Sequence, residues 1–147
     1  MRLWRGIFVG WVVLIILGSS YPWLLGPPQW ERIRWIPFLD VLHSHRLLGD
    51  VIVNFILYVP LGYSYARGGS PTGRKLIFEA GLLGALLAGS CEFYQVFSPV
   101  RYPTMTDVFT NIIGALTGAS IAGIMSRITE SSYPPKTLAG NVSAKNI

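Results

Sequence analysis

Six polar or charged residues carry the functional groups that a binding or catalytic site would need. They are Asn54, Glu92, Gln95, Arg101, Asp107 and Asn111. An arginine guanidinium binds an anionic group through two parallel hydrogen bonds, and amide side chains donate and accept the hydrogen bonds that orient a ligand. We predict that all six residues bind a ligand. Glu92 and Asp107 are also the candidate catalytic residues, because two carboxyl groups in different surroundings can divide the acid and base roles.

The two acids also have a structural interpretation. Charged residues inside membrane proteins are usually paired, so Glu92 and Asp107 could form ion pairs with Arg101 that stabilise the turn between two helices. A closed ion network would favour this structural role, whereas an open cavity would favour a site. The sequence leaves both interpretations open.

We predict no metal site and no cofactor. His43 and His45, with Asp40 nearby, are the histidines that could bind a metal. A spacing of two residues points the two imidazoles to different sides of a helix, and the sequence contains no other histidine. Asp50 is interpreted as a cap or near-cap at the start of a helix, where its charge faces the positive helix end.

The elements that would position these residues are four apolar stretches, at about 6–25, 50–66, 76–97 and 107–126. Each has close to the ~20 residues with which a helix crosses ~30 Å of hydrocarbon. The fold class predicted is therefore an all-α membrane protein, a four-helix transmembrane bundle in one domain at 1–130. Residues 131–147 are predicted to form a disordered cytoplasmic tail. Residues 26–49, which are rich in apolar and aromatic side chains, are predicted to lie in the membrane interface between the first two helices.

Composition agrees with a membrane protein. Hydrophobic residues make up 51% of the 147 residues and charged residues only 13%, which is too apolar for an ordinary soluble domain. The net charge of +5 comes from scattered basic residues without the basic and aromatic clusters of a nucleic-acid interface, so no nucleic acid is expected as a partner.

Small residues recur at helical spacing in the third and fourth stretches. Gly114 and Gly118 form one stripe, and Gly81, Ala85 and Ala88 form another. Because small residues let membrane helices approach closely, we predict that these two stripes pack against each other. Cys91, the single cysteine, is interpreted as a packing residue.

The distribution of basic residues predicts the orientation in the bilayer. With the N-terminus inside, eight Lys and Arg side chains are cytoplasmic and four are outside. Lys and Arg favour the cytoplasmic side, so both termini are expected there, in a multi-pass protein of the bacterial cytoplasmic membrane. The six polar residues then lie near the outer surface. A cleaved signal peptide within residues 1–20 is the alternative for the first stretch.

Three motifs in order resemble the VanZ-like family of small bacterial membrane proteins. They are Asn54-Phe55-Ile56-Leu57-Tyr58-Val59-Pro60-Leu61-Gly62, then Glu92-Phe93-Tyr94-Gln95-Val96-Phe97 followed by Arg101, and Asp107-Val108-Phe109-Thr110-Asn111-Ile112-Ile113-Gly114-Ala115. The resemblance covers about residues 37–125. It implies a four-helix protein of the bacterial cell envelope, in a family named for a member associated with glycopeptide (teicoplanin) resistance. It implies no settled reaction or cofactor.

Three hypotheses about function follow. In the leading one, an outward-facing polar pocket binds or modulates a cell-envelope component, such as a lipid-linked cell-wall intermediate or a lipoglycopeptide. In the second, the protein is an intramembrane hydrolase or transferase that uses Glu92 and Asp107 as an acid/base pair. In the third, it is a structural subunit of a membrane complex with a membrane protein partner. The lipid bilayer surrounds the protein in all three.

Overall fold

The computed structural model describes residues 1–39, 45–69 and 72–132. The predicted histidine pair falls partly outside this range, as does the predicted disordered tail from residue 133 onward. Residues 131–132, which were assigned to that tail, are the last residues of a helix.

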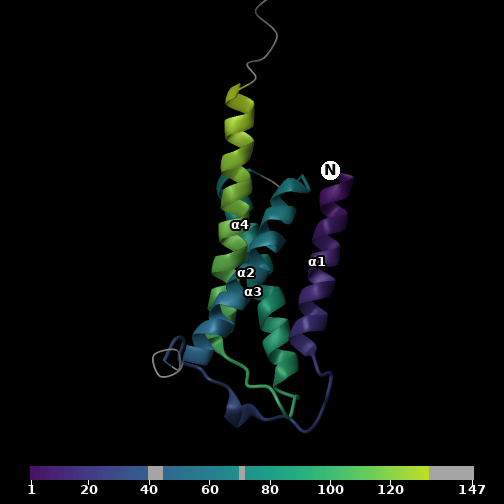
Figure 1. The fold of residues 1–147 in the computed structure, drawn as a ribbon, viewed down its shortest axis with the longest axis vertical. Coiled ribbons are helices and arrows are strands. Elements are labelled where there is room, and N and C mark those ends of the chain that lie inside the picture. Colours follow the sequence, from purple (N-terminus) through teal and green to yellow (C-terminus); the bar gives the residue numbers. More distant parts are fainter. Residues whose placement is uncertain (40–44, 70–71, 133–147) are drawn as a thin grey trace, which may run out of the picture.

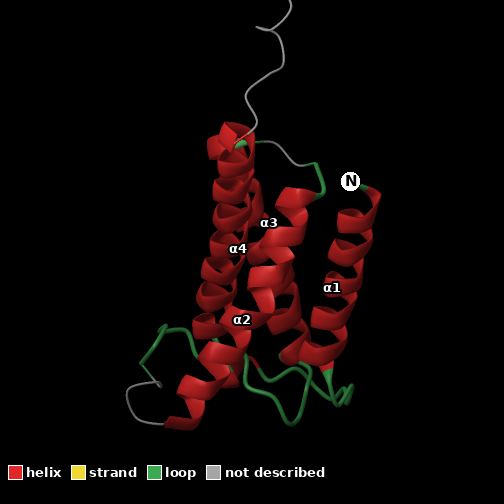
Figure 2. Cartoon of the chain, turned by 45° about the horizontal axis from the view of Figure 1, so that its top comes forward, coloured by secondary structure: helices red, strands yellow, loops and turns green. Residues whose placement is uncertain are grey.

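The described residues form four long helices, α1 (Arg2–Ser20), α2 (His45–Arg67), α3 (Gly73–Gln95) and α4 (Met105–Ser132). A short 3-10 helix, η1 (Trp30–Arg32), lies between α1 and α2. Figure 1 shows the four long helices side by side, with α4 extending beyond the others at the end where the chain starts. Figure 2 shows no strand among the described residues. All four helices are long and apolar enough to cross a membrane, which confirms an all-α, multi-pass membrane protein.

The helix ends differ from the predicted ones for local reasons. α1 ends at Ser20 rather than near residue 25, because Pro22 disfavours the helical conformation at Tyr21, which is extended. α2 begins at His45, so Asp50 lies inside that helix and the interpretation of Asp50 as an N-terminal cap is wrong. α4 continues to Ser132, beyond the end of the apolar stretch at about residue 126, because polar residues can extend a helix past its apolar part.

Small residues bring α2 and α4 into backbone contact. A Cβ atom at Gly114 would lie 2.6 Å from the Phe55 carbonyl oxygen, and one at Gly118 would overlap the Val59 carbonyl. Gly62 of α2 faces the Ala115 backbone in the same way. The prediction that Gly114 and Gly118 pack against the third helix is therefore wrong, since their partner is α2.

The contact between α3 and α4 uses the predicted stripe only in part, since Ala88 is buried and Gly81 lies against Leu116 of α4. Ala80, Gly84 and Ala88 are the buried small residues of α3, whereas Gly81 and Ala85 are only partly buried. Gly84 faces Ala115 and Ile112 of α4. Small residues occur on two neighbouring faces of α3. Their spacing alone therefore could not predict which face packs against α4.

Helix α1 lies against α2. The Trp11 indole donates a hydrogen bond to the Leu57 carbonyl, and Ile15 is the buried residue of α1. Ile15 joins a core cluster with Tyr58, Leu61, Ala88, Cys91 and Ala115, which agrees with the interpretation of Cys91 as a packing residue. Large apolar side chains cover the outside of the helices, among them Phe78 at 70% exposure, as expected for surfaces that face lipid.

Candidate functional site

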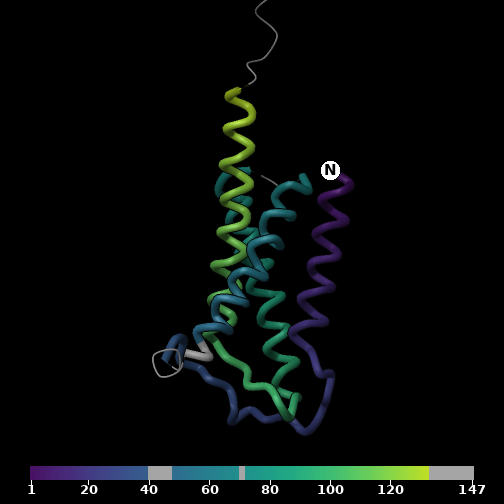
Figure 3. The backbone as a smooth tube through the Cα atoms, in the orientation of Figure 1, coloured from purple at the N-terminus to yellow at the C-terminus, as the bar shows by residue number. Residues whose placement is uncertain are grey.

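Two connecting segments form the floor of the bundle at one end. Residues 21–39 and 96–104 run side by side there, as Figure 3 shows. The Gly26 amide donates to the Phe97 carbonyl at 2.7 Å, and the Arg34 amide donates to the Pro103 carbonyl at 2.9 Å. The segment predicted to be interfacial is therefore tied to the loop between α3 and α4.

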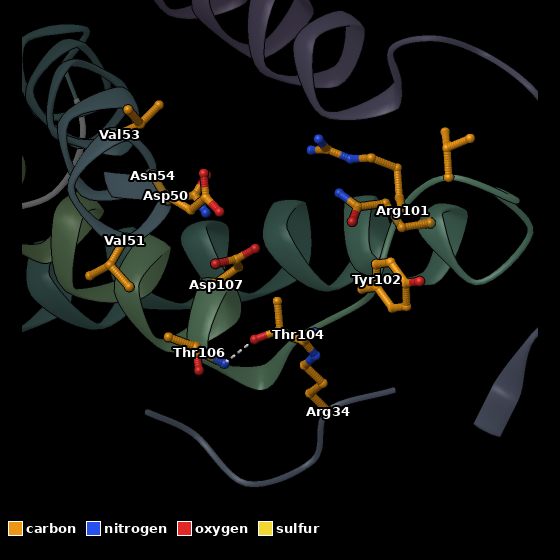
Figure 4. Close-up of a pocket in the computed structure, with 12 residues that line it drawn as sticks. Arg34, Asp50, Val51, Val53, Asn54, Arg101, Tyr102, Thr104, Thr106 and Asp107 are labelled. Atoms are coloured by element: carbon orange, nitrogen blue, oxygen red, sulfur yellow. Dashed lines mark hydrogen bonds between the residues drawn. The ribbon is translucent and has the colours of Figure 1, made fainter. Parts of the chain in front are cut away.

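A cavity of about 360 Å³ opens between this floor and the helices. Figure 4 shows side chains of α2, of α4 and of the α3–α4 loop around it, with Arg34 from the other connecting segment. Its lining residues are Arg34, Asp50, Val51, Val53, Asn54, Gln95, Val100, Arg101, Tyr102, Thr104, Thr106 and Asp107. Four of the six predicted ligand-binding residues therefore line one cavity.

Asp107 and Asn54 meet across the cavity. Asp107 is in the first turn of α4, and its carboxylate interacts with the Asn54 amide of α2. Figure 4 shows Asp50 beside Asn54, one turn earlier on α2. The close packing of α2 on α4 at Gly114 and Gly118 brings the first half of α2 next to the first turn of α4. The result is an acid and an amide that can together accept and donate hydrogen bonds to a ligand.

Glu92 is one of the two predicted ligand-binding residues outside the cavity lining, and its role in binding or catalysis stays a prediction. It does not line the cavity, and its carboxylate accepts a hydrogen bond of 2.7 Å from the Thr104 amide. This bond fixes the end of the loop that bears Arg101. Asp107 and Arg101 are nevertheless electrostatic neighbours of Glu92.

Arg101 is not part of a closed ion network among the residues that the structure describes. Its side chain is exposed, and among the described residues no carboxylate oxygen lies within 4.0 Å of its guanidinium. Figure 4 shows the guanidinium extending from the loop along one side of the cavity. An exposed guanidinium next to a cavity leaves its donors available to an anionic group.

Gln95 and Asn111 are both about 4% exposed. The Gln95 amide lines the cavity and donates to the Ser19 carbonyl at 3.3 Å, which ties the end of α3 to the end of α1. Asn111 is one turn after Asp107 along α4 and is absent from the cavity lining. Its Oδ1 atom has no hydrogen-bond partner among the described residues, and the same is true of the Tyr58 hydroxyl.

The structure adds residues that sequence reasoning missed. Arg34 and Tyr102 line the cavity, and the guanidinium groups of Arg32 and Arg34 lie 5.2 Å and 5.4 Å from the centre of the Tyr102 ring. These cation–π contacts join the two connecting segments. The excess of aromatic and basic residues in both segments was visible in the sequence, but their pairing depends on contacts between distant parts of the chain.

No group of three or more His, Cys, Asp or Glu side chains that could hold a metal occurs in the described ranges. Because Asp40 and His43 lie outside those ranges, the absence of a metal site stays a prediction.

Comparison with curated proteins and with solved structures gave no match. The VanZ/LLP1 family model matches residues 6–126. This match includes α2, α3, most of α1 and α4, both connecting segments and every residue of the cavity lining. The chain belongs to the VanZ/LLP1 family.

Proposed function

We propose that the polar cavity binds an amphipathic component of the bacterial cell envelope that bears an anionic group. The observation that carries this proposal is the position of Arg101, which is exposed at the cavity and has no carboxylate partner within 4.0 Å among the described residues. A guanidinium that forms no direct ion pair within 4.0 Å with a described acid has donors available for a carboxylate or phosphate of a ligand.

The remaining lining supports a ligand with both polar and apolar parts. Asn54, Gln95 and Asp107 offer hydrogen bonds to a ligand in the cavity, and Val51, Val53 and Val100 add apolar surface. Lipid-linked cell-wall intermediates and lipoglycopeptides such as teicoplanin combine these two characters. The family resemblance to a protein associated with teicoplanin resistance supports the same class of ligand.

The position of Glu92 favours binding over catalysis. An acid/base pair needs both carboxyl groups within reach of the reacting atoms. Only Asp107 lines the cavity, while Glu92 bonds to the Thr104 amide. We therefore infer that Asp107 contacts the ligand and that Glu92 holds the loop that presents Arg101.

The proposal places the cavity at the outer surface of the cytoplasmic membrane, with both termini in the cytoplasm. This orientation puts eight basic residues inside and four outside. An outward cavity would receive ligands from the envelope without their crossing the bilayer.

The test measures ligand binding by the purified protein in lipid nanodiscs. Teicoplanin and a polyprenyl-pyrophosphate-linked cell-wall precursor are titrated separately against the wild type, Arg101→Gln and Asp107→Asn. We expect at least one ligand to bind the wild type, with affinity reduced about tenfold or more in Arg101→Gln, because a hydrogen bond to a charged group contributes ~1.5–3 kcal/mol.

Glu31→Gln and Arg2→Gln are the matched controls, since both side chains are exposed and neither lines the cavity. They should bind like the wild type. Equal affinity of Arg101→Gln and wild type for every ligand that binds would exclude this cavity as the site. Absence of binding by the wild type would contradict the proposed ligand class.

A further inference from the structure

A second concave surface lies at the opposite end of the bundle, between the start of α3 and the last turns of α4. This groove has a volume of about 830 Å³. One wall is formed by Thr72, Gly73, Arg74, Leu76 and Ile77. The other is formed by α4, and Ala66 of α2 is also in the lining. The lining residues of α4 are Ala119, Ser120, Ala122, Gly123, Ile124, Ser126, Arg127 and Glu130. The groove shares no residue with the polar cavity.

The floor of the groove is apolar and contains a glycine. Leu76, Ala119 and Ala122 are buried beneath it, and Ile77 and Ile124 expose their side chains along its walls. Gly123 lies in the same lining, and a Cβ atom there would only touch a Leu76 methyl group at 4.0 Å. The absence of a side chain at Gly123 therefore leaves room that a methyl-sized group could fill without displacing backbone.

The rim of the groove is basic. Arg74 of α3 and Arg127 of α4 are exposed on its two sides, and Glu130 is the one acid in the lining, which gives a net charge of one positive unit (two Arg minus one Glu). Neither arginine forms an ion pair within 4.0 Å with another described residue. Lys75 and Arg67, which lie nearby in sequence, instead contact Glu79 and Ser126.

We propose that this groove binds one anionic phospholipid, with acyl chains on the apolar floor and the phosphate between Arg74 and Arg127. The single negative charge of a phosphodiester matches the net charge of the lining. Arginine forks bind phosphate oxygens bidentately. A helix from a second protein would instead cover two unpaired guanidinium groups with apolar side chains, which is costly in a membrane.

The experiment follows the binding of defined lipids to the purified chain in detergent. Native mass spectrometry counts bound dioleoyl-phosphatidylglycerol and dioleoyl-phosphatidylcholine, and thermal melting gives the stabilisation by each lipid. We expect one tightly bound phosphatidylglycerol and a larger increase in melting temperature than with phosphatidylcholine. Arg74→Gln/Arg127→Gln should weaken phosphatidylglycerol binding about tenfold or more, because two charge-assisted contacts are lost.

The matched control is Arg2→Gln/Lys75→Gln, which removes the same total charge from residues outside the groove lining. It should bind phosphatidylglycerol like the wild type. Gly123→Leu should fill the groove and abolish tight binding, and Gly123→Ala checks that the position tolerates a side chain. If Gly123→Leu fails to fold, the arginine pair and its control decide the question.

Three results of the lipid experiments would overturn the proposal, and a fourth would come from the oligomeric state. The first is equal binding of the two lipids. The second is unchanged phosphatidylglycerol affinity in the double arginine variant. The third is equally tight binding of glycerophosphoglycerol, which has the head group but no acyl chains, because the apolar floor would then play no part. A dimer that dissociates in Gly123→Leu without any dependence on lipid would assign the groove to a second copy of the chain.

Discussion

At the scale of single residues, Glu92 and Arg101 have different roles in the proposed site, although the sequence predicted that both bind a ligand. The Glu92 carboxylate accepts a hydrogen bond from the Thr104 amide, so it holds the α3–α4 loop in place. Arg101 is on that loop and extends along the cavity without an ion pair to a described carboxylate. Substitutions at Glu92 and at Arg101 can therefore test the anchoring of the loop and the binding of a ligand separately.

Replacing Glu92 by alanine should destabilise the protein by about 1–3 kcal/mol, because the Thr104 amide loses its acceptor. Glu92→Gln should remain close to wild type in stability, since the amide oxygen of glutamine can accept the same hydrogen bond. Thermal melting in detergent measures both. If Glu92→Gln kept its melting temperature and its ligand but lost a turnover that the wild type showed, Glu92 would act in catalysis.

At the scale of elements, the position of the cavity depends on the crossing of α2 and α4. Gly62, Gly114 and Gly118 allow backbone contact between these helices. The contact places Asn54, in the first half of α2, beside Asp107 in the first turn of α4. The small residues thus act on the site through helix geometry and not through their own chemistry.

Gly118→Leu should lower the melting temperature in detergent and cost about 1–3 kcal/mol or more, because its side chain would overlap the Val59 and Tyr63 backbone. Gly89→Leu is the matched control, since a Cβ atom at Gly89 has nothing within 4 Å. We expect the control to melt like the wild type. Equal stability of the two variants would contradict the α2–α4 contact.

At the scale of the whole molecule, the two ends of the bundle have different characters. One end has the polar cavity between the connecting segments and the helices, and the other has the apolar groove with two arginines on its rim. Four crossings place the start of α1, the turn between α2 and α3 and the end of α4 at the groove end (Figure 1). The orientation of the bundle decides which membrane leaflet each concave surface meets.

Reporters fused to the N-terminus, near Ser70 and after Ser131 should all behave as cytoplasmic, because Lys and Arg are in excess at that end. Periplasmic or extracellular activity near Ser70 would reverse the orientation and turn the polar cavity to the cytoplasm. Loss of the N-terminal reporter from the membrane-bound chain would indicate that α1 is cleaved. We expect α1 to be retained, because Trp11 bonds to the Leu57 carbonyl and Gln95 bonds to the Ser19 carbonyl of α1.

The sequence by itself determined the all-α class, the four membrane helices, the family and four of the residues that line the candidate site. These features follow from local properties, since a bilayer requires about 20 apolar residues per helix and internal backbone hydrogen bonds. Asn54, Gln95, Arg101 and Asp107 could be assigned to one cavity because consecutive crossings bring the relevant helix ends to the same side.

Only the tertiary structure decided which faces meet and which side chains reach the cavity. Gly118 packs on α2 and not on α3, because both helices offer small residues and the choice depends on how whole surfaces fit. Arg34 enters the lining because its segment bonds to the loop at Pro103, far away in sequence. Glu92 turns to the Thr104 amide because the loop leaves a donor there. These contacts join residues that no local pattern relates.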